Sequence, residues 1–336
     1  MLYLFHRLTF ILLFCSLALL DLFITSCNKE SSWDAAGNDT LLTNIKYWAY
    51  LIDSLDHAGC IESLVQSRYD LIVMDQQRSI KGSEWHDTRS DVMRIKNSMN
   101  SSDGKKLVLC YINVGQAERY RSYWQDGWET GNPEWIMEPD PDGWNDNYGV
   151  RFWSTEWKNI MKASIREIVN DGFDGIYLDW LMIYELPEIQ QAAILEGLNA
   201  RQEIAGFVRE ISSYARQLDE DFLIIGQNAA ELVAEPGYLK VVNGIAQEHI
   251  WFDGSGDPDE GGSEGDVTVP EEDSEYVIDI LKSWQQKGKL VFNVEYALIE
   301  ENARKAYSNG KDHNFRTYVT TRLLNRLTST PPPGMP

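Results

Sequence analysis

The amino-acid sequence predicts a (β/α)8 barrel, and two observations support that prediction. Eight short apolar runs recur between residues 44 and 330, and amphipathic helical patterns lie between several of them. Strands that alternate with helices form parallel βαβ units, and a segment of this length suits a full barrel. A doubly wound sheet is the alternative, but no Gly-x-Gly-x-x-Gly motif follows the first apolar run.

The apolar runs are bounded by polar or turn residues, as expected of buried strands. In order they are 47–52, 69–74, 106–112, 173–178, 222–226, 244–247 and 290–294, with a weaker eighth near 315–320. The seven stronger runs lead into the polar or acidic residues Asp53, Asp75, Asn113, Asp179, Asn228, Glu248 and Glu295. Because the carboxyl ends of parallel strands meet at one mouth of a barrel, we expect these side chains to converge. For Asp179 alone, capping of a following helix is an equally good interpretation.

Helical periodicity covers residues 156–169, 189–218 and 274–286, whereas residues 317–327 fit either a last strand edge or a closing helix. Two insertions follow the third and the sixth apolar run. Residues 117–157 contain six tryptophans, and core packing is the alternative to a binding role for each of them. Residues 253–273 are acidic and rich in glycine. They lack the EF-hand spacing, and we interpret them as a mobile loop.

The chain begins with the pattern of an export signal. Residues 1–26 combine a weakly positive start with an apolar run at 8–20 that is too short to span a membrane. Residues 24–27 resemble a bacterial lipobox, so we expect lipidation of Cys27, with ordinary cleavage near Ser26 as the alternative. This predicts an exported lipoprotein, attached to the membrane by its N-terminal lipid, at the outer membrane and cell surface or in the periplasm.

The other domain boundaries follow from composition. Residues 27–43 are polar and predict a flexible tether. Residues 44–330 are expected to form the barrel as a single domain, and the proline-rich residues 331–336 predict a disordered tail. We expect the protein to act as a monomer.

The balance of charge and the cysteines restrict the function classes. The 30 Lys and Arg residues face 52 Asp and Glu residues, giving a formal charge of −22. Nucleic-acid binding calls for basic patches, so we exclude a nucleic-acid partner. A cationic substrate would be attracted, although an acidic soluble surface is the simpler explanation. No Cys/His spacing fits a zinc site, Cys110 lies in an apolar run as a buried thiol, and we expect no metal and no cofactor.

Carboxylates combined with aromatic side chains are the requirement of glycoside hydrolysis. One carboxylic acid protonates the leaving oxygen while the other attacks the anomeric carbon or activates water. Aromatic rings stack on the apolar faces of sugars. The aromatic candidates near strand ends are Tyr50, Tyr111, Trp153, Tyr177, Trp180 and Tyr296.

Several segments then match one family. They are Tyr111–Arg121 followed by Trp124, Tyr148–Trp153, Gly172–Asp179, Gln227–Glu231 and Gly244–Glu248. Together they resemble glycoside hydrolase family 114, the endo-α-1,4-polygalactosaminidase family. The similarity is greatest to its bacterial and archaeal extracellular branch, once mislabelled as cysteinyl-tRNA-synthetase-related. The resemblance spans roughly Trp48 to Ala297.

The resemblance implies a (β/α)8 barrel with catalytic acids at the ends of strands four and six. Carried over to this chain, Asp179 is the nucleophile and Glu248 the general acid/base of a retaining mechanism. Their carboxyls are then expected about 5–5.5 Å apart. The remaining residues that we assign to substrate binding are Tyr50, Asp75, Tyr111, Asn113, Glu118, Trp153, Tyr177, Asn228, Glu295 and Tyr296.

The implied substrate is an α-linked polysaccharide. A galactosamine polymer is cationic when deacetylated and would suit a cleft lined by Asp75, Glu118 and Glu295. Trp180 directly after the nucleophile and the glycine-rich insertion after Glu248 depart from the family pattern and would reshape the cleft. Three other readings remain open at this point: a non-catalytic glycan-binding lipoprotein, a carboxylate-rich metal-dependent hydrolase, and a structural surface protein, against which the aromatic insertion argues.

Overall fold

A computed structural model describes residues 39–144, 146–255, 258 and 261–336. The expected export signal, Cys27 and most of the expected tether lie outside the described residues. All of the described residues belong to one compact unit. Among the described residues, no helix is long and apolar enough to cross a membrane.

Eight parallel strands form the central sheet, and their order in space is their order in the chain. They are β1 (Trp48–Tyr50), β2 (Leu71–Met74), β3 (Leu107–Asn113), β7 (Gly175–Asp179), β8 (Leu223–Gln227), β9 (Gly244–Glu248), β12 (Leu290–Tyr296) and β13 (Arg316–Thr320). Nearly every residue in them is buried, as expected of strands covered on both faces. The eight predicted runs thus all form strands, including the weak eighth.

The first and last strands meet, so the sheet is a nearly closed barrel. The Trp48 indole N–H donates to the Arg316 carbonyl at 2.6 Å, and the Arg316 Nε donates to the Ile45 carbonyl at 2.7 Å. Beyond the strands, the Ile52 amide donates to the Leu324 carbonyl at 2.9 Å. This arrangement confirms the predicted (β/α)8 barrel and excludes the doubly wound sheet, in which the first and last strands do not come together.

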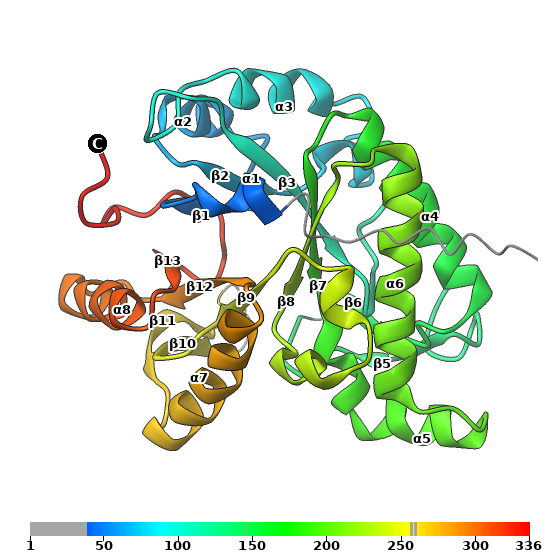
Figure 1. Ribbon diagram of the computed structural model, residues 1–336. Helices are drawn as coiled ribbons and strands as arrows, with labels where there is room; N and C mark the ends of the chain where they lie inside the picture. Colours follow the sequence, from blue (N-terminus) through cyan, green and yellow to red (C-terminus); the bar gives the residue numbers. More distant parts are fainter. Residues whose placement is uncertain (1–38, 145, 256–257, 259–260) are drawn as a thin grey trace, which may run out of the picture. The chain divides into compact units, whose positions relative to one another are not determined.

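Helices cover the outside of the strands (Figure 1). They are α2 (Cys60–Gln66), α3 (Thr88–Lys96), α4 (Thr155–Asn170), α5 (Pro187–Leu195), α6 (Ala200–Leu218), α7 (Glu271–Gln286) and α8 (Glu300–Asp312). The predicted helix over 189–218 is two helices. Gly197 adopts a φ of +74°, which ends α5, and the Asn199 side chain then caps α6 by accepting from the Gln202 amide. Residues 317–327 begin as a strand and form no closing helix.

The ends of the barrel domain make contacts with it. The short helix α1 (Asp39–Thr43) lies within the segment expected to be a tether, and its Leu42 is fully buried in the core. In the C-terminal segment expected to be disordered, Met335 packs against the same core.

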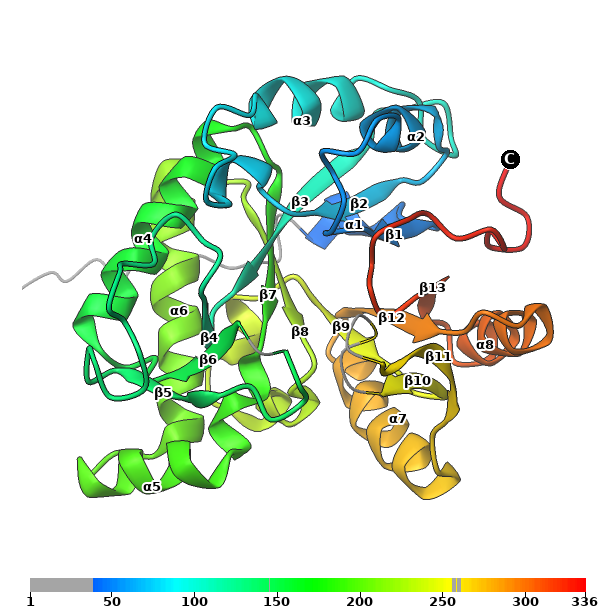
Figure 2. The same cartoon turned by 180° about the vertical axis from the view of Figure 1, so that it is seen from behind.

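Both insertions form small sheets. Strands β4 (Gln116–Glu118), β5 (Ile136–Pro139) and β6 (Asn147–Val150) pair in the order β4-β6-β5, and β10 (Phe252–Ser255) pairs with β11 (Ser263–Thr268). Figure 2 shows both at the end of the barrel toward which β3 and β9 run. The second insertion was expected to be a mobile loop. Its described residues instead form a hairpin that packs on β12, so closely that a Cβ on Gly265 would lie 2.7 Å from the Tyr296 carbonyl.

Aromatic side chains fill the barrel interior and the first insertion. Trp48 lies within 6.3 Å of the rings of Tyr50, Tyr177, Phe292 and Tyr318, measured between centroids. Four of the six tryptophans of the insertion pack on one another, in the chain Trp124, Trp128, Trp135 and Trp157. The core-packing interpretation therefore holds for those four.

Candidate active site

A cavity of about 910 Å³ lies at the carboxyl ends of the strands. The predicted site residues that line it are Tyr50, Asp75, Tyr111, Glu118, Asp179, Asn228, Glu248 and Tyr296, together with Asp53 and Trp180. They come from the ends of β1, β2, β3, β7, β8, β9 and β12 and from the first insertion. The structure therefore brings together residues that are more than 240 positions apart in the chain.

Asp179 ends β7 and is held by two donors. Its Oδ2 accepts from the Tyr111 hydroxyl at 2.8 Å, and its Oδ1 accepts from the Trp180 amide at 2.6 Å. The second bond depends on a φ of 56° at Trp180. Gly115 makes room for this turn, because a Cβ there would lie 2.2 Å from the Trp180 carbonyl oxygen. Asp179 caps no helix: the 3-10 helix that follows, Leu181–Glu185, receives no side-chain cap.

Glu248 ends β9, two strands further round the barrel. Its Oε2 accepts from the Asn228 amide nitrogen at 2.9 Å, and its Oε1 accepts from the Tyr296 hydroxyl. Asn228 is fixed in turn, because its Oδ1 accepts from the Glu248 amide at 3.1 Å and from the Gln247 side chain at 3.0 Å. The orientation of the Asn228 amide therefore follows from a backbone donor that cannot reverse.

Left-handed backbone is concentrated directly after these strands. Ser54, Trp180, Asn228, Ala229 and His249 have φ values of 58°, 56°, 56°, 51° and 40°. Such conformations in residues other than glycine are unfavourable and cluster at functional sites. Three of them, Trp180, Asn228 and His249, line the cavity themselves.

The two carboxyls influence each other's protonation. Burial and the nearby charge of Glu248 raise the pKa of Asp179 to about 8, and the hydrogen bonds from Tyr111 and Trp180 only partly oppose this. Ionisation of Asp179 beside the Glu248 carboxylate is therefore unfavourable, so Asp179 keeps a proton in the site up to a pH of about 8. Burial and the same carboxylates raise the pKa of the Tyr111 and Tyr296 hydroxyls well above their usual value, which keeps both tyrosines protonated as donors.

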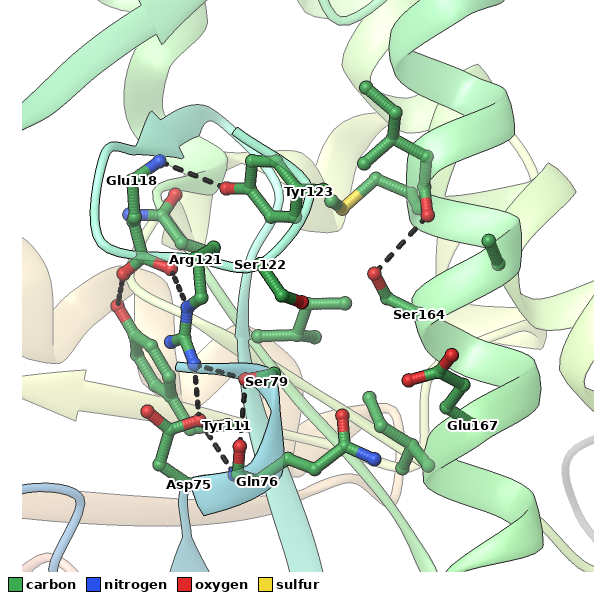
Figure 3. A pocket seen from close by; sticks show the side chains of 16 residues that line it. Asp75, Gln76, Ser79, Tyr111, Glu118, Arg121, Ser122, Tyr123, Ser164 and Glu167 are labelled. Atoms are coloured by element: carbon green, nitrogen blue, oxygen red, sulfur yellow. Dashed lines mark hydrogen bonds and ion pairs between the residues drawn. The ribbon is translucent and has the colours of Figure 1, made fainter. Parts of the chain in front are cut away.

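Arg121 holds two further carboxylates of the site (Figure 3). Its Nη1 donates to Asp75 Oδ1 at 2.8 Å and its Nε donates to Glu118 Oε2 at 2.6 Å. The Tyr120 hydroxyl donates to Glu118 Oε1 at 2.6 Å, and the Tyr111 hydroxyl lies 3.5 Å from the same oxygen. Burial raises the pKa of Asp75, and the Arg121 charge opposes that rise. This buried network forms one wall of the site and separates it from a second cavity of about 280 Å³ beside α4.

Four residues expected to bind substrate do not line the main cavity. Tyr177 lies beneath it, with its ring 4.9 Å from that of Tyr50. Asn113 is buried and holds the β3–β4 turn by accepting from the Gln116 amide at 2.8 Å. Trp153 lies in the turn between β6 and α4, where its indole N–H donates to Glu196 at 2.8 Å.

Glu295 is the fourth of these residues, and its carboxylate binds backbone amides. It is fully buried and accepts from the amides of Ile250, Trp251 and Phe252 at 2.9, 3.0 and 2.7 Å. Burial raises its pKa to about 7, while the Asn293 side chain and these amides oppose the rise. Glu295 thus fixes the segment that follows Glu248. Its strand-end position and acidity alone could not distinguish that role from substrate binding.

Sequence reasoning did not assign Asp142, Trp144 or Arg322 to the cavity that they line. Asp140 organises the first two, because its Oδ1 accepts from the amides of Asp142 and Trp144 at 2.7 and 3.3 Å. The Asp-Pro-Asp-Gly run at 140–143 is a turn signal that could have indicated this loop. Arg322 follows the weakest strand and carries no such signal. Its guanidinium lies 5.9 Å from the Trp144 ring centroid and donates to Asp253 at 3.2 Å.

The cavity is lined by several acidic side chains. Within the part of the chain that the structure describes, no three His, Cys, Asp or Glu side chains are grouped in a way that could hold a metal ion.

Comparison with known sequences places these residues in context. The model of glycoside hydrolase family GH114 matches residues 87–332. The chain is 32% identical over 222 residues to an uncharacterised protein of Deinococcus radiodurans, covering 66% of each chain. It is 29% identical over 278 residues to one of Thermotoga maritima, covering 82% of this chain and 76% of that protein. It is 30% identical over 259 residues to one of Methanocaldococcus jannaschii, covering 75% and 67%.

Two solved structures share the fold. The glycoside hydrolase domain of PelA from Pseudomonas aeruginosa superposes with a TM-score of 0.61 at 17% identity, covering 85% of this chain and 98% of that chain. Aspergillus fumigatus Ega3, solved in complex with galactosamine, gives a TM-score of 0.55 at 16% identity, covering 84% and 93%. At such identities the likeness concerns the barrel alone.

Proposed function

The chain belongs to glycoside hydrolase family GH114, and we propose that it is a retaining glycosidase that cleaves an α-linked polysaccharide carrying free amino groups. One observation supports this most: two carboxyls from β7 and β9 face one cavity, and the raised pKa of Asp179 keeps a proton in that site at neutral pH. Retaining hydrolysis needs one ionised and one protonated carboxyl at the same time. A site that keeps a proton beside a second carboxyl can supply both forms.

In this proposal Asp179 is the nucleophile and Glu248 the general acid/base, following the family resemblance. Glu248 donates its proton to the glycosidic oxygen while Asp179 attacks the anomeric carbon, which gives a covalent glycosyl-enzyme and frees the leaving chain. Glu248 then takes a proton from water, which attacks the anomeric carbon and releases Asp179.

The hydrogen-bond partners suit these changes of protonation. Each carboxyl has one N–H partner that only donates, from Trp180 or Asn228. Each also has a tyrosine hydroxyl, from Tyr111 or Tyr296, which can donate to a carboxylate or accept from a carboxylic acid. Glu248 can therefore gain and lose its proton without losing a hydrogen bond.

The charge of the cavity supports a cationic substrate, although the carboxylates differ from those expected from the sequence. Arg121 already pairs with Asp75 and Glu118, and Glu295 binds backbone amides. Beyond the catalytic pair, the rim carries Asp53, Asp142 and Asp253, and of these Arg322 pairs with Asp253. An excess of negative charge attracts an ammonium-bearing sugar. A partly deacetylated galactosamine polymer is the substrate that we propose.

A digestion experiment tests the reaction and its stereochemistry. The wild type, Asp179→Asn and Glu248→Gln are incubated with partly deacetylated α-1,4-linked polygalactosamine and with uncharged α-linked glucans. We expect the wild type to release oligosaccharides from the amino polymer, and each variant to lose at least about a hundredfold in rate. Proton NMR of the first products should show the α-anomer. A β-anomer would show inversion and would contradict both the nucleophile assignment and the expected 5–5.5 Å separation.

Binding without turnover is the alternative function. It would hold if the wild type bound the amino polymer and released nothing, with both carboxyl variants binding equally well.

We also propose that the protein is an exported lipoprotein and acts as a monomer. Export rests on the signal pattern of residues 1–26 and lipidation on Cys27. Metabolic labelling with a tritiated fatty acid should mark the wild type and not Cys27→Ser. Equal labelling, or none in the wild type, would contradict lipidation at this residue. Light scattering should give the mass of one chain.

A further inference from the structure

The β2–α3 loop carries a tryptophan that the core does not use. Trp85 is 81% exposed, which is the highest value among the exposed large hydrophobic residues of the described chain. At this exposure most of the apolar surface of the indole is in contact with water. The loop leaves the carboxyl end of β2, which is the face of the barrel that holds the cavity.

The Trp85 ring is held in place although it is exposed. Its indole N–H donates to the Gly82 carbonyl at 3.0 Å, within the same loop. The next residue, His86, has its ring 6.0 Å away and is itself fixed by a 2.8 Å contact with Asp91. Because the N–H is already satisfied, the ring offers its apolar π face rather than a polar contact. A rigid aromatic face of this kind binds with little loss of conformational entropy.

The same loop is joined to the rim of the cavity. Ile80 lines the cavity and pairs with Arg121, and the Lys81 amide donates to the Tyr120 carbonyl at 2.8 Å. Two tight turns then follow, closed by the Ser83 and His86 amides at 3.0 and 2.9 Å. Trp85 lies five positions after Ile80, so their Cα atoms are at most about 18 Å apart, and the turns shorten that distance. A few sugar units leaving the cavity past Ile80 and Tyr120 would reach the indole.

From these observations we infer that Trp85 is an outlying binding platform for the polysaccharide chain whose cleavage is proposed above. The apolar face of a sugar ring would stack on the indole, and a free ammonium group of an amino sugar would add a cation–π contact. The inference rests on the proposed function. It adds that the enzyme binds long chains across the rim of the cavity.

Binding in an inactive background tests this without turnover. Asp179→Asn is compared with Asp179→Asn/Trp85→Ala, with Asp179→Asn/Trp85→Phe and with a control, Asp179→Asn/Tyr276→Ala. Tyr276 is an exposed aromatic residue on α7 (62% exposed) that does not line the cavity. Calorimetry measures affinity for partly deacetylated α-1,4-linked galactosamine chains, from the disaccharide to the polymer. Melting temperatures check that all four variants fold.

We expect Trp85→Ala to weaken polymer binding roughly three- to tenfold, Trp85→Phe to restore most of the affinity, and Tyr276→Ala to match the parent. The Trp85→Ala effect should vanish for the disaccharide. If the parent and Trp85→Ala bound the polymer with equal affinity, the inference that Trp85 is a binding platform would be wrong, and the proposed function would be unaffected. A parent that binds no chain of any length would overturn the proposed substrate, and the platform with it.

Discussion

At the scale of single residues, the Tyr111 hydroxyl has the most direct influence on the proposed nucleophile. It donates to Asp179 at 2.8 Å, and this bond lowers the pKa of Asp179 against the larger effect of burial. In the wild type we expect kcat/KM to fall as the pH rises above about 8, because the pair then loses the proton that the general acid must donate.

Tyr111→Phe should move that alkaline limb to higher pH. Without the hydroxyl the charged form of Asp179 loses a donor, so its pKa rises further, and activity near neutral pH should fall about 10- to 100-fold. The measurement is kcat/KM from pH 5 to 10. Tyr50→Phe is the matched control, because the Tyr50 hydroxyl donates to Gln227 and not to a catalytic carboxyl. If the alkaline limb of kcat/KM did not move in Tyr111→Phe, the Tyr111 hydroxyl would not control the pKa of Asp179.

The proposed nucleophile should also lower the stability of the fold above neutral pH. A carboxyl whose pKa is raised in the folded state favours folding at pH values below its unfolded pKa, near 4. This contribution is lost as the pH rises to the folded value of about 8. Asp179→Asn cannot ionise. It should therefore be more stable than the wild type at pH 8, by roughly 2 kcal/mol.

Thermal or urea unfolding at pH 5 and pH 8 measures this difference. The gap between Asp179→Asn and wild type should be larger at pH 8 than at pH 5. An exposed carboxylate changed in the same way, Glu272→Gln at the start of α7, should show no such pH dependence. A gap that is equal at the two pH values would indicate that Asp179 is ionised throughout.

At the scale of elements, the end of β7 depends on a glycine in the neighbouring turn. A Cβ at Gly115 would lie 2.2 Å from the Trp180 carbonyl oxygen and 2.9 Å from its Cβ. Both contacts involve atoms that cannot move away without moving the backbone. Gly115→Ala should therefore destabilise the fold by about 2–4 kcal/mol and displace the Trp180 amide from Asp179.

Gly206→Ala provides a control for this substitution. Gly206 lies inside α6, where a Cβ would meet only the mobile end of Arg209 at 3.5 Å. Alanine is the better helix former by about 1 kcal/mol, so Gly206→Ala should keep or raise the melting temperature. If both variants had the same melting temperature, the close approach at Gly115 would not contribute to the stability of the fold.

The elements also show what the sequence could predict. Strand ends were visible because a short apolar run changes abruptly to a carboxylate or amide, and that change located Asp179, Asn228 and Glu248. The same signal selected Glu295, whose carboxylate binds three backbone amides, because a buried acid of this kind has the same local sequence as one that faces a ligand. Whether a side chain at a strand end is buried or faces the cavity depends on elements that follow later in the chain.

Contacts across the cavity could not be predicted in this way. Arg322 reaches Trp144 from a segment almost 180 positions away, and its sequence neighbourhood resembles an ordinary loop. The hairpin of β10 and β11 was interpreted as a mobile loop because glycine-rich acidic runs are usually turns. Gly254 and Gly265 instead permit close packing against Arg322 and Tyr296. In both cases the partner, not the segment itself, determines the structure.

At the scale of the whole molecule, the excess of acidic residues should act on the rate of substrate capture. The formal charge is −22, and the rim of the cavity adds Asp53 and Asp142 close to the site. Attraction between a negative protein and a cationic chain is screened by salt, over about 10 Å at 0.1 M and 3 Å at 1 M. We therefore expect kcat/KM for partly deacetylated polygalactosamine to fall at least about tenfold between 20 mM and 500 mM sodium chloride.

Three comparisons separate this effect from a general response of the protein to salt. The kcat at saturating polymer should change little, because long-range attraction acts on encounter and not on the bound complex. Asp142→Asn should have a lower kcat/KM than the wild type at low salt, and the two proteins should differ less at high salt. Asp312→Asn, at the far end of α8, should match the wild type at both salt concentrations. Fully N-acetylated polymer, which carries no charge, should show almost no salt dependence. If it showed the same dependence as the amino polymer, charge would not be what selects the substrate, and the acidic surface would serve solubility alone.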